Sequence, residues 1–141
     1  MKARLKLLAA LAALSLAMMA CGVSFNGIES TGELVSEERP VSGFNQVSLS
    51  GFGTLVITQG ETEGLTIEAD EKVLEYIETS VVGNELKIGF KPGISILNTG
   101  PVYYYLAVED LEAIELSGSG DAEMDSLDTN SLEVVISGSG D

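Results

Sequence analysis

A five-residue motif that occurs twice near the end of the chain limits the fold more than any other feature. The letters Ser-Gly-Ser-Gly-Asp stand at residues 117–121 and return twenty residues later at 137–141, and the related Ser-Gly-Phe-Gly stands at 50–53. Each copy follows a short run in which apolar residues alternate with polar ones. Short strands that end in a Gly-rich turn and recur at a near-fixed period are typical of stacked β-structure. We therefore expect an all-β fold, a parallel β-solenoid with rungs of about 20 residues.

Two local patterns predict additions to this fold. Residues 70–79 begin with acidic residues and carry apolar side chains at helical spacing, which predicts one short helix of one or two turns. Two alternating runs flank Gly83 and Asn84, and both residues tolerate the positive φ that two-residue turns require. The second pattern therefore predicts a β-hairpin near residues 81–90.

An aromatic run at residues 102–108 is the most strand-like segment of the chain, because it consists of tyrosines and β-branched or aliphatic residues. Alternation along a strand places Tyr103 and Tyr105 on one face and Tyr104 on the other. Two interpretations of the paired tyrosines are open. They pack within a strand that is covered on both sides, or they form a stripe that binds a carbohydrate or a protein.

The first 20 residues are expected to be a lipoprotein signal peptide. Three basic residues precede an apolar run of about 14 residues, which is shorter than the roughly 20 residues of a membrane-spanning helix. Residues 18–22, Met-Met-Ala-Cys-Gly, resemble a bacterial lipobox, although Met18 stands where the lipobox usually has Leu. The resemblance implies cleavage between Ala20 and Cys21 and acylation of Cys21, for example with palmitate. The alternative is an ordinary signal peptide that a cysteine happens to follow.

The rest of the chain divides into two parts. Residues 21–38 are rich in Gly, Ser, Asn and Glu and have no sustained period, which predicts a flexible tether. Residues 39–141 contain the strand patterns and form the expected β-solenoid domain. Cys21 is the only cysteine, so an internal disulfide is excluded. We expect an exported protein that its lipid holds on the extracytoplasmic side of the bacterial cell envelope, anchored to the membrane by two or more acyl chains.

The charge of the chain excludes one class of partner. Three of the seven basic residues lie in the signal peptide, which holds no Asp or Glu, so residues 21–141 carry 22 acidic and 4 basic residues and a net charge of −18. Such a surface repels the phosphates of nucleic acids and of anionic lipids. We therefore expect no nucleic-acid partner, and we expect the link to the membrane to be the lipid itself.

Several segments of the chain, taken in order, resemble the head GIN domain, a family described as putative auto-transporter adhesins. They are Gly43-Phe44, residues 47–51, 55–60 and 83–88, and the two repeats that end in Ser-Gly-Ser-Gly-Asp. The resemblance runs from residue 39 to the end. It implies a right-handed β-helix-like fold, bacterial export, frequent lipid anchoring and no established enzyme activity. Members usually continue through more rungs, which implies that this head domain is truncated at its C-terminus.

The residue inventory excludes several catalytic chemistries. The chain has no histidine, and its one cysteine is the expected lipid attachment site. Ser-His-Asp and Cys-His nucleophiles and Cys/His zinc sites are therefore excluded. The Gly-rich motif lacks the Lys and the following helix of a phosphate-binding loop. Carboxylates are abundant enough for a glycosidase pair, but no pair stands in a recognisable context. We expect no enzyme activity, no catalytic residue and no cofactor.

Asp121 and Asp141 close the two copies of the motif and are the weak candidates for calcium ligands. In register, they would stack at a turn and accept hydrogen bonds from backbone N–H groups. A bound Ca²⁺ would relieve the repulsion between them. Calcium-binding β-roll repeats have the form G-G-x-G-x-D, however, which differs from the motif here in period and spacing. The sequence therefore assigns no metal.

These observations together predict a non-catalytic cell-envelope lipoprotein with an adhesin-like head that contacts a protein or glycan surface. Two alternatives are open: a structural or stress-related envelope component without a specific ligand, and a β-helix enzyme that acts on polysaccharide. Exposed aromatic residues would favour the first function, a featureless acidic surface the second, and a cleft with two close carboxylates the third.

Overall fold

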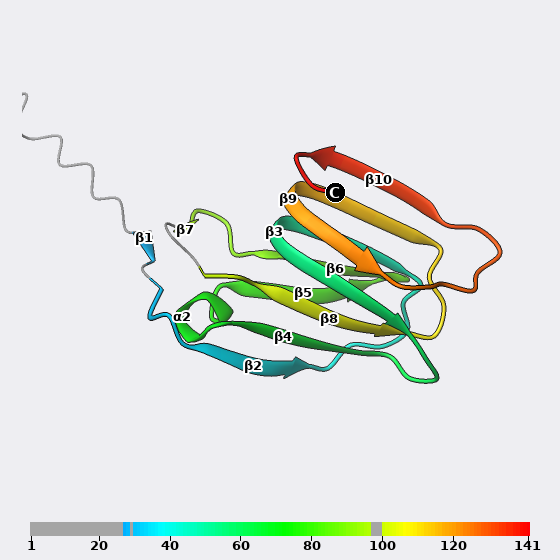
Figure 1. Cartoon of the computed structure of the whole chain (residues 1–141), viewed down its shortest axis with the longest axis horizontal. Helices are drawn as coiled ribbons and strands as arrows, with labels where there is room; N and C mark the ends of the chain where they lie inside the picture. The colour runs from blue at the N-terminus through cyan, green and yellow to red at the C-terminus, as the bar shows by residue number, and fades with distance from the viewer. Residues whose placement is uncertain (1–26, 29, 97–99) are drawn as a thin grey trace, which may run out of the picture.

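The computed structural model describes residues 27, 28, 30–96 and 100–141 of the chain. This part consists of strands and one helical turn (Figure 1). The elements are β1 (Gly27–Ile28), β2 (Leu34–Arg39), β3 (Gln46–Gln59), β4 (Gly64–Asp70), α2 (Glu71–Leu74), β5 (Ile77–Val82), β6 (Glu85–Phe90), β7 (Ser95–Ile96), β8 (Tyr103–Val108), β9 (Ala113–Met124) and β10 (Glu133–Gly138).

The long strand β3 organises the main sheet, whose order is β10-β9-β3-β8-β4-β2. Its first residues, 46–49, pair with β6, and its last residues, 54–59, pair with β8. Strand β9 pairs with β3 along both parts, from residue 113 to residue 124. Strand β5 then pairs with β6. The sheet thereby bends around a shared interior and takes a barrel-like shape (Figure 1).

The all-β class is confirmed, but a wholly parallel solenoid is not, because the sheet is mixed. Strand β3 runs parallel to β6, β8 and β9, whereas β4 runs antiparallel to β2 and β8, and β5 runs antiparallel to β6. The two-residue link between β5 and β6 is too short for the crossover that parallel neighbours need. The expected twenty-residue rung does occur at one place, where β10 pairs in parallel with β9 and Glu133 lies opposite Ala113.

Two of the three Gly-rich motifs, at residues 50–53 and 117–121, lie inside strands, at the bends of β3 and β9, and the third, at 137–141, begins in β10 and continues past its end. Gly51 and Gly53 have φ of 122° and 114°, and Gly118 has φ of 109°. L-residues with a side chain rarely adopt such φ values. A Cβ at Gly53 would also stand 2.7 Å from Cε2 of Tyr104. Glycine is therefore required where these strands bend around the interior.

The interior is lined mainly by aliphatic side chains from the strands of the bent sheet. Leu49, Leu55 and Leu116 from β3 and β9 are almost wholly buried, and so is Tyr104 from β8. The hydroxyl of Tyr104 donates a hydrogen bond to the carbonyl oxygen of Phe52 at 3.3 Å. Burial without that partner would leave the phenol hydroxyl unpaired, which is costly in an apolar interior. The same burial raises the pKa of Tyr104 well above its ordinary value, so the hydroxyl stays protonated.

The two local predictions from the sequence correspond to real elements. Strands β5 and β6 form the hairpin expected near residues 81–90, with Val82 opposite Glu85 and Gly83 at a φ of 66°. The helix expected near residues 70–79 is a single turn, α2, which ends at Leu74. Ile77 has the helical spacing but begins strand β5, where it is buried.

The folded part begins earlier than residue 39, the start expected from composition. Strand β2 covers residues 34–39 and pairs antiparallel with β4 along its whole length. Strand β2 carries mostly exposed polar residues, so its sequence lacks the alternation of a half-buried strand. Of the expected signal peptide and tether, residues 1–26 and 29 lie outside the described residues.

Asp70 fastens the segment that precedes β2 to the rest of the domain. Its carboxylate oxygen Oδ2 accepts hydrogen bonds from the Ser30 hydroxyl at 2.9 Å, from the backbone N–H and hydroxyl of Thr31 at 2.5 and 2.7 Å, and from the backbone N–H of Gly32 at 2.9 Å. Its other oxygen accepts from the backbone N–H of Lys72 at 3.0 Å and caps α2. These donors favour the charged carboxylate and hold the pKa of Asp70 far below its ordinary value, against the opposing effect of burial.

Candidate recognition surface

Strand β8 turns two tyrosines outward, on the face opposite the core. Tyr104 is wholly buried, whereas Tyr105 is 42% exposed and Tyr103 is half-buried. The rings of Tyr103 and Tyr105 stack, with centroids 6.1 Å apart and an angle of 24° between their planes. The alternation predicted from the sequence is confirmed, and no second layer of described residues covers the outward tyrosines. They form a small aromatic platform.

Polar side chains of the neighbouring strands surround this platform. Residues opposite each other in a sheet point to the same side, so the register identifies the neighbours directly. One row across β2, β4, β8, β3 and β9 is Ser36, Glu68, Tyr103, Thr54 and Asp121, and the next is Glu38, Thr66, Tyr105, Val56 and Glu123. We call these ten residues the tyrosine face.

The tyrosine face combines flat apolar rings with hydroxyls and carboxylates. Glu68 accepts a long hydrogen bond, 3.4 Å, from the hydroxyl of Ser36. Partial desolvation raises the pKa of Tyr105, and the negative charge of Glu68 and then Tyr103 add to the effect. Tyr105 therefore remains a neutral hydrogen-bond donor at and above neutral pH. The tyrosine face therefore presents aromatic rings for stacking, together with hydrogen-bond donors and acceptors, on one side of the sheet.

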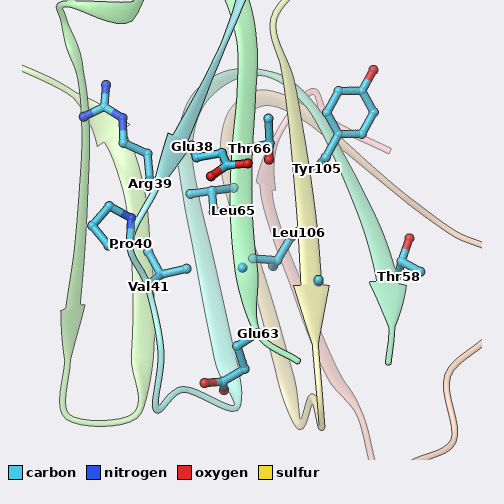
Figure 2. Close-up of a pocket in the computed structure, with 12 residues that line it drawn as sticks. Glu38, Arg39, Pro40, Val41, Thr58, Glu63, Leu65, Thr66, Tyr105 and Leu106 are labelled. Carbon is cyan, nitrogen blue, oxygen red and sulfur yellow. The ribbon is translucent and has the colours of Figure 1, made fainter. Parts of the chain in front are cut away.

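An open groove of about 620 Å³ extends the tyrosine face along β4 and β8. Figure 2 shows Glu38 and Thr66 next to each other in this groove, with Tyr105 to one side and Glu63 at the far end. Thr58 and Val41 also line the groove. Oxygens of Glu63 accept hydrogen bonds from the backbone N–H groups of Gly43 and Phe44 at 2.6 and 3.3 Å, so this carboxylate is held by the loop between β2 and β3.

A second cleft of about 790 Å³ lies between β2, α2 and β5 and was not anticipated from the sequence. Four glutamates line it, together with Arg39 and Lys91: Glu37, Glu71, Glu75 and Glu78. Both cations bind backbone carbonyl oxygens, Arg39 that of Leu74 at 3.2 Å and Lys91 that of Glu75 at 2.7 Å. The lining residues come from β2, from α2 and its C-cap, from β5 and from Lys91, so no short motif could have identified this acidic cleft.

The calcium candidates Asp121 and Asp141 lie next to each other, Asp121 inside β9 and Asp141 three residues beyond the last residue of β10. Asp121 Oδ1 accepts a hydrogen bond from the backbone N–H of Asp141 at 3.0 Å, but Asp121 stands within a strand and not at the expected turn. Within the described residues, no group of three or more Asp, Glu, His or Cys side chains is arranged to hold a metal ion. Asp121 instead belongs to the outer row of the tyrosine face.

The predicted cleavage and lipid attachment sites, Ala20 and Cys21, lie outside the described residues. In the part of the chain that is described, no helix has the length and hydrophobicity needed to cross a membrane.

The fold and this outer surface define an all-β domain that displays a polar and aromatic sheet face to solvent. A family model identifies the protein family of this domain. The head GIN domain, described as a putative auto-transporter adhesin, matches residues 43–141. The chain belongs to this family, as the resemblance in its sequence predicted. No curated protein sequence is significantly similar to the chain.

Solved structures share the fold. A putative adhesin from Bacteroides fragilis superposes with a TM-score of 0.76 at 22% identity, over 81% of this chain and 54% of its own. A putative adhesin from Parabacteroides merdae has a TM-score of 0.66 at 18% identity and covers 78% and 46%. A putative lipid binding protein from Parabacteroides distasonis has a TM-score of 0.66 at 18% identity and covers 79% and 49%. The chain thus spans about half the length of these relatives.

Proposed function

We propose that the protein is a non-catalytic lipoprotein of the bacterial cell envelope, whose head domain binds a neutral glycan through the tyrosine face. The observation that carries the proposal is the stacked pair of Tyr103 and Tyr105, which lies outward among hydroxyl and carboxylate side chains. Membership of a family described as adhesins supports a role in surface recognition.

The chemistry of the tyrosine face favours a sugar as the ligand. Aromatic rings provide flat apolar area against which the C–H faces of a pyranose ring can pack, and their hydroxyls add hydrogen bonds. Carboxylates such as Glu38 and Glu68 accept bonds from sugar hydroxyls. The net charge of −18 for residues 21–141 opposes an anionic glycan. We therefore assign a neutral oligosaccharide to this face.

The first prediction concerns glycan binding by the soluble head domain. Wild-type residues 22–141 are applied to an array of defined neutral and acidic oligosaccharides, beside the Tyr103→Ala/Tyr105→Ala double variant. We expect the wild type to bind neutral glycans and the double variant to bind them at least about tenfold more weakly, because each lost aromatic contact contributes on the order of 1 kcal/mol.

The control for this experiment removes an exposed apolar side chain from another face. Val82 is 59% exposed and lies at the tip of the β5–β6 hairpin, which pairs with β3 and not with β8. Val82→Ala should bind as the wild type does, and Tyr105→Phe should retain most of the stacking contribution. An array without neutral-glycan binding by the wild type would reject the proposed ligand. It would favour a structural envelope component instead.

Membrane attachment is proposed through Cys21, the only cysteine of the chain. Intact mass spectrometry of the full-length protein, expressed in a bacterium and extracted from its membranes, should give the mass of residues 21–141 plus a diacylglyceryl group on the Cys21 thiol, with or without one further acyl chain on its α-amino group. Two or more chains bind a membrane stably, whereas one does so only marginally. Cys21→Ser should release the protein from the membrane fraction. An unmodified mass that begins elsewhere would contradict the lipid anchor.

A further inference from the structure

The tyrosine face continues along β8 into a third row of residues, in which the side chains are small. Gly64 of β4 and Thr58 of β3 both lie opposite Ala107 of β8. The row before it contains Thr66 and Tyr105. Residues two apart along a strand point to the same side of the sheet, so the third row lies on the same side as the ring of Tyr105. The aromatic platform is therefore followed by a step down in side-chain size.

The small residues of the third row create the groove of about 620 Å³. Gly64, Ala107 and Thr58 all line it. Glycine has no side chain and alanine has a single methyl group, so the space above them is open. A Cβ at Gly64 would meet nothing within 4 Å. Tyr105 stands to one side of this space and Glu63 at its far end (Figure 2).

The groove has the chemistry of a sugar-binding position. Val41 is half-buried and, together with Ala107, offers apolar surface. Thr58 is exposed, and its hydroxyl donates and accepts hydrogen bonds. Both oxygens of Glu63 accept from backbone N–H groups, which fixes the carboxylate and leaves lone pairs for sugar hydroxyls. Sites for small molecules combine apolar walls with a few fixed polar groups in this way.

The groove and the aromatic platform lie on one line along the sheet. Tyr103, Tyr105 and Ala107 are alternate residues of β8, so the three rows extend over about 13 Å at about 3.3 Å per residue. A site of this shape fits an extended chain of sugar rings better than a coiled one. The β-1,4 linkage between rings with equatorial hydroxyls gives an extended chain, and such rings present flat C–H faces to aromatic side chains.

We propose that the groove is a second sugar position beside the tyrosine platform, and that the two together bind a linear, neutral, β-1,4-linked oligosaccharide of glucose or N-acetylglucosamine. This assignment rests on the proposed glycan binding, because the first rings of the chain stack on Tyr103 and Tyr105. It adds the linkage and the shape of the glycan. It also makes Gly64 and Ala107 the residues that determine how many rings bind.

The experiment titrates the head domain, residues 22–141, with two series of β-1,4-linked oligomers of one to five units, one of glucose and one of N-acetylglucosamine. For at least one series, calorimetry should show a Kd that falls at least about tenfold between the shortest oligomer that binds and the oligomer two units longer, because the added rings gain hydrogen bonds and apolar contacts in the groove. NMR shifts of the Thr58 and Gly64 amides should appear only with the longer oligomer.

Substitutions in the third row separate the groove from the platform. Gly64→Phe places a ring in the open space, with no clash at its Cβ and with φ outside the left-handed region. This variant should bind the shortest oligomer as the wild type does and lose the gain from the added units, and Ala107→Leu should reduce that gain. Gly60→Phe is the matched control, because a Cβ there also meets nothing within 4 Å and Gly60 does not line the groove. It should keep the whole gain.

Three results would overturn the groove position while glycan binding by the tyrosines stands. The first is binding of other neutral glycans on the array without binding of either oligomer series. The second is equal affinity for short and long oligomers. The third is an equal gain in the wild type, Gly64→Phe and Ala107→Leu. If the wild type binds no neutral glycan at all, the proposed function and the groove position are both wrong.

Discussion

Replacing Gly118 with alanine should destabilise the domain by about 3 kcal/mol or more, a large part of the total stability of a domain of this size. The added Cβ would overlap the carbonyl oxygen of Gly51 on the neighbouring strand, and φ at Gly118 is 109°, which L-residues with a side chain rarely adopt. Neither strand can move aside easily, because β9 pairs with β3 over twelve registered positions. Urea denaturation of the wild type and the variant measures the difference.

The matched control is alanine at Gly60, where a Cβ would meet nothing within 4 Å and φ lies outside the left-handed region. Gly60→Ala should be neutral or stabilising by up to about 1 kcal/mol, because the substitution reduces the conformational entropy of the unfolded chain. A Gly118 variant as stable as the Gly60 variant would show that the close packing of β3 against β9 does not exist in solution.

Removal of the Asp70 carboxylate should detach the segment before β2 and lower the melting temperature by roughly 10 °C or more. Asp70→Ala leaves the N–H groups of Thr31 and Gly32 and the hydroxyls of Ser30 and Thr31 without their common acceptor. Calorimetry measures the loss, and hydrogen exchange should rise first in β2. If exchange rises equally in every strand, Asp70 does not act by holding the segment before β2 in place.

The pH dependence of the same contact has a definite sign. Because the pKa of Asp70 is lower in the folded protein than in the unfolded chain, the contribution of the carboxylate is fully present above the ordinary pKa of 3.8. It is lost as the pH falls below that value toward the folded pKa. The stability of Asp70→Asn should therefore fall less steeply between pH 4 and 2 than that of the wild type. Parallel curves would show that Asp70 does not contribute to acid unfolding.

The features that follow from local sequence were predictable. The hairpin of β5 and β6 depends on Gly83 and its neighbour, because the turn sets both the pairing and its register. The twenty-residue spacing of the Gly-rich motif predicted the parallel pairing of β9 with β10, since only equal spacing brings glycine against glycine. Membership of the head GIN domain family was also visible in the sequence.

The mixed order of the sheet was not predictable, because it depends on pairing between distant segments. Strand β4 joins β2 on one side and β8 on the other, and no repeat or turn connects these three segments. Strand β2 was assigned to a tether because it carries charged and exposed residues in place of an alternating pattern. Its position follows from backbone pairing with β4 and from the anchor at Asp70.

The candidate site was predictable only in part. Alternation placed Tyr103 and Tyr105 on one face, but it did not say which face is open to solvent. That depends on Tyr104, whose ring fills the interior, and on the absence of a described layer over the outer side of β8. Thr66 and Glu68 come from β4 and Thr54 from β3, so their approach to the tyrosines is set by long-range register.

The central claim, recognition of a neutral glycan by the tyrosine face, is tested most directly by NMR titration of the ¹⁵N-labelled head domain with the neutral oligosaccharide that binds most strongly on the array. We predict saturable shifts that centre on the amides of β8 and on the facing residues of β3 and β4. Shifts that centre instead on the acidic cleft between β2, α2 and β5 would contradict the claim.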